Sequence, residues 1–136
     1  MSILELQNVE KIYGEKENQV KALRNINLQV EEGEFVAIVG TSGSGKSTLL
    51  NLIGALDNPT RGKIFIKKRE IGSLSRKELI IFRRRNIGFV FQNYSLMPVL
   101  NVYDNVALPV TFDRGRHINR KYMEELLRAA WASGKA

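Results

Sequence analysis

Residues 40–47 read GTSGSGKS, and their types and spacing are those of a phosphate-binding loop. They fit the pattern G-x-x-x-x-G-K-[ST] at every fixed position. The glycines let the backbone adopt positive φ, so that successive N–H groups can line a concave nest for phosphate oxygens. Lys46 can reach the β and γ phosphates, and the hydroxyl of Ser47 is placed to ligate Mg²⁺. The residues predicted to contact a nucleotide are Gly40, Thr41, Ser42, Gly43, Ser44, Gly45, Lys46, Ser47 and Thr48.

The sequence on either side of this loop has the periodicity that such a site needs. Residues 35–39 (FVAIV) form an uninterrupted apolar run, which predicts a parallel strand buried on both faces. From Thr48 to Leu56 apolar residues recur at helical spacing. An anion in the loop would therefore meet the N-terminus of a helix, where unpaired N–H groups and the macrodipole favour negative charge. A flexible Gly/Ser turn is the alternative, and the flanking elements favour nucleotide binding over it.

Composition sets the limits of the interpretation. With 136 residues and 43% hydrophobic content, the chain is one ordinary domain or part of a larger one. It has no Cys, which excludes a disulfide framework and a thiolate metal site and fits a reducing compartment. No apolar stretch approaches the length of a membrane span, and the N-terminus lacks the features of a signal peptide. We therefore expect a soluble, cytoplasmic protein.

The formal net charge of +7 raises the question of nucleic-acid binding. Basic residues gather at positions 67–69, 83–85 and 114–121. These clusters lie in different predicted elements, and none is interleaved with the aromatic residues that would stack on bases. We interpret them as solvated surface and expect no nucleic-acid partner. A nucleic-acid-binding phosphate-loop protein stays as the less favoured alternative.

The first part of the chain shows strand patterns around the loop. Residues 3–12 and 26–30 alternate broadly between apolar and polar types, which predicts two half-buried antiparallel strands. The polar turn at residues 57–62 precedes a short predicted strand at residues 63–67.

The second part contains helix signals. Ser75 and Glu78 form a capping box that opens a helix to about Arg84. A second apolar strand is predicted at residues 87–91, with Gln92 at its end. Two further helices are then expected. One begins near Asn101 and Asp104 and is closed by Pro109, and the other begins at Asn119 with an apolar face of Tyr122, Met123, Leu126, Leu127 and Ala130.

Several motifs together resemble an ATP-binding cassette (ABC) transporter ATPase. The chain resembles this family over about residues 3–109, in the order and spacing of residues 11–14 (KIYG), 22–26 (ALRNI), 40–50, 59–62 (PTRG), 87–92 and 94–98 (YSLMP). Residues 96–98 and 105–109 resemble the branch that serves lipoprotein release, macrolide-type export or related exporters.

The resemblance implies an α/β fold, the phosphate-loop NTPase core of the ABC ATPase type. Residues 1–92 would hold an N-terminal antiparallel β subdomain and the phosphate-loop core. Residues 93–136 would begin a helical subdomain, so that the chain is a truncated, partial ATP-binding domain.

The resemblance also assigns roles and partners. Tyr13 matches the aromatic residue that stacks on adenine, and Gln92 matches the catalytic glutamine that contacts Mg²⁺ and the attacking water. Ser47 and Gln92 would thus be the metal contacts, with ATP and Mg²⁺ as cofactors. Residues 93–108 would face a transmembrane permease subunit, and a second ATP-binding subunit would complete a dimer. The protein would then be peripheral on the inner face of the cell membrane.

Other family elements do not occur in these 136 residues. The Leu-Ser-Gly-Gly-Gln signature and the catalytic carboxylate after a hydrophobic strand are missing, and His117 lies well before the switch position. We interpret the chain as the N-terminal half of an ABC ATPase and expect no ATP turnover from it alone, because phosphoryl transfer depends on such positioning. A regulatory or structural module that binds nucleotide without hydrolysis is the alternative. A GTPase is disfavoured because no Asn-Lys-x-Asp string occurs.

The resemblance carries one expectation about the sheet. In the family, the strand before the phosphate loop and the strand before the glutamine are not neighbours. Residues 35–39 and 87–91 would then present unpaired backbone groups, which favours association with another chain.

Overall fold

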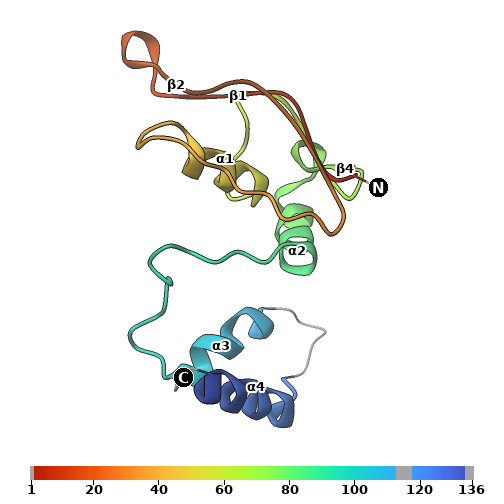
Figure 1. Ribbon diagram of the computed structural model, residues 1–136, viewed down its shortest axis with the longest axis vertical. Coiled ribbons are helices and arrows are strands. Elements are labelled where there is room, and N and C mark those ends of the chain that lie inside the picture. The colour runs from red at the N-terminus through yellow and green to blue at the C-terminus, as the bar shows by residue number, and fades with distance from the viewer. Residues whose placement is uncertain (1, 113–117, 134–136) are drawn as a thin grey trace. The chain divides into compact units, whose positions relative to one another are not determined.

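The computed structural model describes residues 2–112 and 118–133. The chain forms two compact units, Met1–Phe89 and Val90–Ala136 (Figure 1). The phosphate loop belongs to the first unit and Gln92 to the second. His117, which the sequence analysis compared with the switch histidine of the family, lies outside the described residues.

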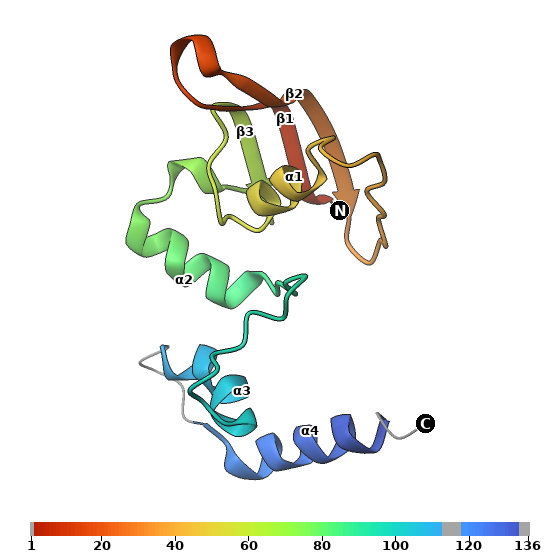
Figure 2. The same ribbon diagram turned by 90° about the vertical axis from the view of Figure 1, so that its left-hand side faces the viewer.

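An antiparallel sheet forms the framework of the first unit (Figure 2). Strands β1 (Ser2–Tyr13) and β2 (Val20–Glu31) make a long hairpin closed through a 3₁₀ turn, η1 (Lys16–Asn18). Strands β3 (Arg61–Ile66) and β4 (Arg69–Glu70) complete the order β2-β1-β3-β4. The predicted N-terminal strand pair and the strand after the polar turn are therefore confirmed.

A bulge in β1 lets the strand keep one face on the core although its alternation is broken. Leu6 and Val9 are both buried but lie three residues apart, whereas a regular strand repeats every second residue. The β1–β2 register shifts between them, and Asn8 takes a positive φ of 48°. The Asn8 N–H donates to Oδ1 of Asn27 at 2.9 Å, so the displaced backbone has a partner.

Two helices and a 3₁₀ turn complete the first unit. Helix α1 (Lys46–Ile53) follows the phosphate loop, η2 (Ile71–Ser73) follows β4, and α2 (Arg76–Asn86) comes next. The predicted capping box of α2 is confirmed, because Oγ of Ser75 accepts from the Glu78 N–H and the Glu78 carboxylate accepts from the Ser75 N–H at 2.9 Å. Three arginines in the last turn complement the helix dipole.

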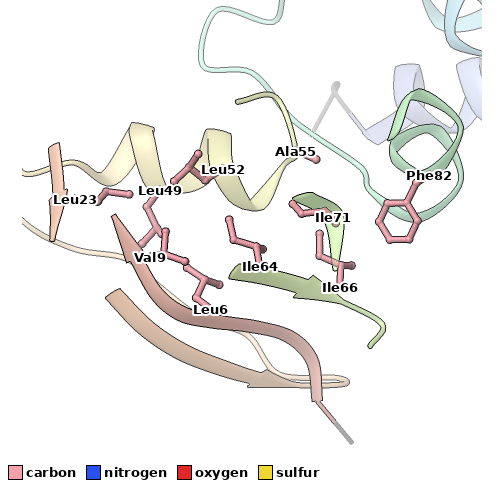
Figure 3. Close-up of a cluster of buried hydrophobic side chains, with 10 residues drawn as sticks. All are labelled: Leu6, Val9, Leu23, Leu49, Leu52, Ala55, Ile64, Ile66, Ile71 and Phe82. Carbon is pink, nitrogen blue, oxygen red and sulfur yellow. The ribbon is translucent and has the colours of Figure 1, made fainter. Parts of the chain in front are cut away.

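The hydrophobic core lies between the sheet and α1. Figure 3 shows side chains of α1 directed toward those of β1 and β3. Its members come from α1, α2, three strands, η2 and the turn after α1: Leu6, Val9, Leu23, Leu49, Leu52, Ala55, Ile64, Ile66, Ile71 and Phe82. Because α1 carries the loop at its N-terminus, this packing fixes the direction from which the loop meets the sheet.

The two apolar runs predicted as strands are not strands. Residues 35–39 and 87–91 form no β-ladder, and Phe35 and Val90 are 97% and 93% exposed. Only Ile38 and Ile87 pack partly against the core. A strand buried on both faces needs neighbours that supply hydrogen bonds, and apolar composition alone does not provide them. The prediction of strands at both runs is therefore wrong.

The second unit contains helices α3 (Val102–Thr111) and α4 (Arg120–Ser133). The Asp104 N–H donates to Oδ1 of Asn101 at 2.8 Å, and the Tyr122 N–H donates to Oδ1 of Asn119 at 3.1 Å, so both predicted starts are confirmed. Within the described residues, no helix has both the length and the apolar character needed to span a bilayer.

Two details of the second unit differ from expectation. Pro109 was expected to close α3, but it lies inside the helix, which continues to Thr111. A proline removes only one backbone donor, and the helix tolerates that loss here. On α4 the predicted apolar face is buried only in part. Met123 is buried and Leu127 half-buried, whereas Tyr122 and Leu126 are exposed.

Leu52 and Leu50 offer a matched test of how α1 is held. Leu52 is 0% exposed and Leu50 is 47% exposed on the same helix. Leu52→Ala should lower the free energy of unfolding by about 2–5 kcal/mol, because it removes buried methyl groups and leaves a cavity. Leu50→Ala should change it by less than about 1 kcal/mol. Urea unfolding followed by circular dichroism measures both, and equal losses would contradict this packing of α1.

Candidate nucleotide-binding site

The predicted loop has the backbone geometry of an anion-binding turn that leads into a helix. Gly43 and Gly45 have positive φ of 76° and 91°. Gly45 is the N-cap of α1, and no side chain caps the helix there. The first turn of α1 therefore keeps N–H groups available to a ligand, at the end of the helix where the dipole is positive.

The three glycines of the loop differ in what a side chain would meet at each position. A Cβ at Gly45 would lie 2.6 Å from the carbonyl oxygen of Ala22, so this position permits the loop to touch β2. A Cβ at Gly40 would lie 2.7 Å from Oγ of Ser44. Gly43 has open space around it, and its requirement is the left-handed backbone alone.

Lys46 spans the loop that it follows. Its ammonium group donates to the carbonyl oxygens of Gly40 at 2.9 Å and Thr41 at 2.6 Å. It also lies 3.3 Å from Oγ of Ser44. These acceptors are neutral, so a phosphate oxygen, which carries negative charge, is a stronger partner for the same ammonium. The loop thus holds the Lys46 ammonium in place with weak partners that a phosphate oxygen could replace.

The loop forms one wall of a cavity of about 230 Å³. Six of the predicted contact residues line it, Gly43, Ser44, Gly45, Lys46, Ser47 and Thr48, while Gly40, Thr41 and Ser42 do not. The other wall is the start of β2, namely Val20, Lys21 and Ala22. The sequence interpretation missed this wall, including a second lysine beside the loop. The signal available for it was the hairpin pattern, which places the start of the second strand opposite Tyr13.

Tyr13 stands at the end of β1, in register with Val20. Because Val20 lines the loop cavity, the hairpin brings the predicted adenine platform to the strand that forms the cavity wall. The Tyr13 hydroxyl donates to Oδ2 of Asp57 at 3.0 Å. Its ring is 41% exposed, which leaves surface for stacking.

Asp57 is the centre of a small charged cluster beside this ring. Its Oδ1 accepts from the Lys11 ammonium at 2.7 Å. Burial disfavours the ionised carboxylate, but hydrogen bonds from Lys11, from the Asn58 N–H and from Tyr13 outweigh it and lower the pKa of Asp57. The carboxylate is therefore ionised at neutral pH. Sequence reasoning did not single out Lys11 or Asp57, which are 46 positions apart.

The predicted metal contacts are Ser47 and Gln92. Ser47 lies exposed in the first turn of α1 and lines the loop cavity, so its hydroxyl is accessible to a cation. Gln92 is exposed in the second unit. No group of three or more His, Cys, Asp or Glu side chains that could hold a metal occurs among the described residues. Hydroxyl and amide oxygens such as those of Ser47 and Gln92 are hard ligands of the kind that Mg²⁺ takes beside waters and substrate phosphates.

Residues 93–108, predicted to face a permease, expose apolar side chains in the second unit. Tyr94, Leu96, Val99 and Val102 are all exposed. Four large apolar side chains are thus exposed within one short segment of the chain.

The geometry of the loop and of the helix that follows it is that of the phosphate-loop class of nucleotide-binding proteins. The sequence profile described as ABC transporter matches residues 23–134. The chain belongs to the ABC transporter family, and the matched part is the ATP-binding domain.

Relatives and a solved structure agree with this assignment. An uncharacterized ABC transporter ATP-binding protein of Methanocaldococcus jannaschii is 48% identical over 92% of this chain and 56% of its own length. The bacitracin export ATP-binding protein BceA of Halalkalibacterium halodurans is 44% identical over 92% of this chain and 48% of its length. The macrolide export ATP-binding/permease protein MacB of Mannheimia succiniciproducens is 42% identical over 99% of this chain and 21% of its length.

The dimeric ATP-binding cassette MJ0796, solved in a post-hydrolysis state with ADP and Pi, has a similar structure. Its TM-score is 0.83 at 45% identity, and the match covers 92% of this chain and 54% of that one. The expected fold class and family are thereby confirmed, and two relatives carry exporter names as the branch resemblance predicted. The chain spans about half the length of the first curated relatives it matches.

Alanine substitutions at Gly45 and Gly43 distinguish the effect of a steric contact from the effect of backbone strain. Alanine at either position must adopt positive φ, which costs about 1–2 kcal/mol. Gly45→Ala also forces a Cβ against the Ala22 carbonyl, whereas Gly43→Ala meets open space. We expect Gly45→Ala to lower the urea midpoint clearly more than Gly43→Ala does. Equal midpoints would show that the loop does not touch β2 as described.

Proposed function

We propose that this chain binds Mg-ATP through its phosphate loop and forms part of the nucleotide-binding domain of an ABC transporter that serves export or lipoprotein release. The observation that carries the proposal is the loop itself. A lysine ammonium, an uncapped helix N-terminus and a cavity of about 230 Å³ meet in one short segment. The ammonium and the helix N-terminus both favour an anion with several oxygens, as a nucleoside triphosphate has, and the cavity beside them leaves room for it.

Different residues of the site would contact different parts of the nucleotide. The N–H groups at the start of α1 would donate to phosphate oxygens, and Lys46 would exchange its neutral carbonyl partners for the β and γ phosphates. Tyr13 would lie under the adenine, where stacking is worth about 1–3 kcal/mol. ATP supplies the phosphoryl group, and these side chains position it.

Magnesium would bind through the hydroxyl of Ser47 and the side-chain oxygen of Gln92, together with phosphate oxygens. Gln92 would also orient the attacking water in the complete protein. Hydroxyl and amide oxygens are hard ligands of the kind that Mg²⁺ prefers.

The partners in this proposal are a second ATP-binding subunit and a transmembrane permease. Support for the first comes from MJ0796, which is similar to this chain and was solved as a dimer. Support for the second comes from relatives that are named as export proteins and from the exposed apolar side chains in residues 93–108. The chain would then be peripheral on the cytoplasmic face of the membrane.

Lys46→Ala tests the assigned site directly. Removal of the charge-assisted contact should weaken Mg-ATP binding by about 1.5–3 kcal/mol, or about 10- to 100-fold. Isothermal titration calorimetry of the parent and the variant measures the change. Inorganic tripolyphosphate should lose affinity as well, because it presents the same phosphate oxygens to Lys46.

Lys77→Ala is the matched control, since it removes an exposed lysine from α2 that does not line the loop cavity. Its Mg-ATP affinity should equal that of the parent. If Lys46→Ala binds Mg-ATP as tightly as the Lys77 control, the loop is not the nucleotide site.

A further inference from the structure

We propose that Asp57 is a positioning residue for the nucleobase: together with Lys11 it fixes the ring of Tyr13 in the orientation that stacks on adenine. We call Lys11, Tyr13 and Asp57 the base brace. The inference rests on the proposed function, since it concerns how the same site receives ATP. It adds two residues that lie outside the phosphate loop.

The contacts within the base brace are mutual. The Tyr13 hydroxyl donates to one carboxylate oxygen of Asp57 at 3.0 Å, and the Lys11 ammonium lies 2.7 Å from the other. The same ammonium lies 4.9 Å from the centroid of the Tyr13 ring, within the range of a cation–π contact. Each of the three side chains therefore contacts both of the others.

Lys11 is held firmly enough to act as one wall of the platform. Its side chain is 12% exposed, and its ammonium also donates to the Asn58 carbonyl at 2.8 Å. Because this ammonium lies over one face of the Tyr13 ring, the opposite face is the one left for a base. The hydroxyl bond to Asp57 restrains the far end of the ring, so that it cannot turn freely about its side-chain torsions.

The backbone around Asp57 is tied to the end of β1. The Thr60 N–H donates to the Glu10 carbonyl at 2.8 Å, and the Ile12 N–H donates to Oγ1 of Thr60 at 3.0 Å. The turn that carries Asp57 is thus fixed to the strand that carries Tyr13. This arrangement turns an aromatic residue at a hairpin end into a preorganised surface.

Preorganisation predicts a modest and base-dependent effect on affinity. If the ring has to be ordered when the ligand binds, the lost side-chain entropy lowers the affinity by about 2- to 10-fold. Asp57→Ala should therefore weaken Mg-ATP binding by about 2- to 10-fold. Binding of inorganic tripolyphosphate should stay unchanged, because that ligand has no base to stack on Tyr13.

The experiment is calorimetric titration of the full chain with two probes, Mg-ATP and magnesium tripolyphosphate. The variants are Asp57→Ala and Tyr13→Phe, which removes the hydroxyl bond while keeping the ring. Both should show the same ATP-selective loss, and the double variant should lose no more than either single one. The control is Glu70→Ala, which breaks the Lys63–Glu70 ion pair elsewhere in the same unit. It should leave both affinities unchanged.

The outcomes separate this inference from the proposed function. If tripolyphosphate binds in a Lys46-dependent manner but Asp57→Ala and Tyr13→Phe leave ATP affinity unchanged, the base brace is wrong and the phosphate site stands. Equal losses of ATP and tripolyphosphate in the Asp57 variant would also overturn the brace, because they would indicate general structural damage. A parent chain that binds neither probe would overturn both proposals. If Asp57→Ala does not fold, Tyr13→Phe decides the question alone.

Discussion

The close approach of the phosphate loop to β2 is the constraint on which the rest of the site depends. The backbone at Gly45 passes so near the Ala22 carbonyl that no side chain fits between them. Leu49 and Leu52 hold α1 in the core from its first two turns, so the start of the helix is kept close to β2. The result is a helix N-terminus that opens toward the start of β2, with a lysine from each side of the cavity, Lys21 and Lys46.

Charge in the first unit is organised in two separate ways. At the loop, the Lys46 ammonium is satisfied by neutral carbonyl oxygens and remains available to a stronger acceptor. At the base brace, the Lys11 ammonium is paired with the ionised carboxylate of Asp57 and has a structural role. The two lysines therefore have different roles, although both lie in a chain of net charge +7. A phosphate would compete well for the first and poorly for the second.

Local signals in the sequence predicted their elements correctly. The capping box of Ser75 and Glu78 and the caps at Asn101 and Asn119 each join residues three positions apart, and the phosphate-loop pattern lies within residues 40–47. Such short-range chemistry is visible in a sequence because the partners are close along the chain. The roles of Tyr13 and Gln92 remain predictions from family resemblance.

Several features that depend on distant partners were predicted wrongly or not predicted from the sequence. The apolar runs at residues 35–39 and 87–91 looked like strands, but a strand is defined by its ladder, and these runs have none. The pairing of Lys11 with Asp57 spans 46 positions and follows from the sheet register and the turn after α1. Pro109 shows the opposite case, in which a strong local signal for a helix end was overridden by the turns around it.

Hydrogen exchange of backbone amides, with and without Mg-ATP, tests the central claim most directly. The claim is that the N–H groups at the start of α1 are the donors to phosphate, so their exchange should slow when the nucleotide binds. We expect protection at residues 43–48, and none of that size at residues 76–86 of α2. Protection spread equally over both helices, or absent from residues 43–48, would contradict the account.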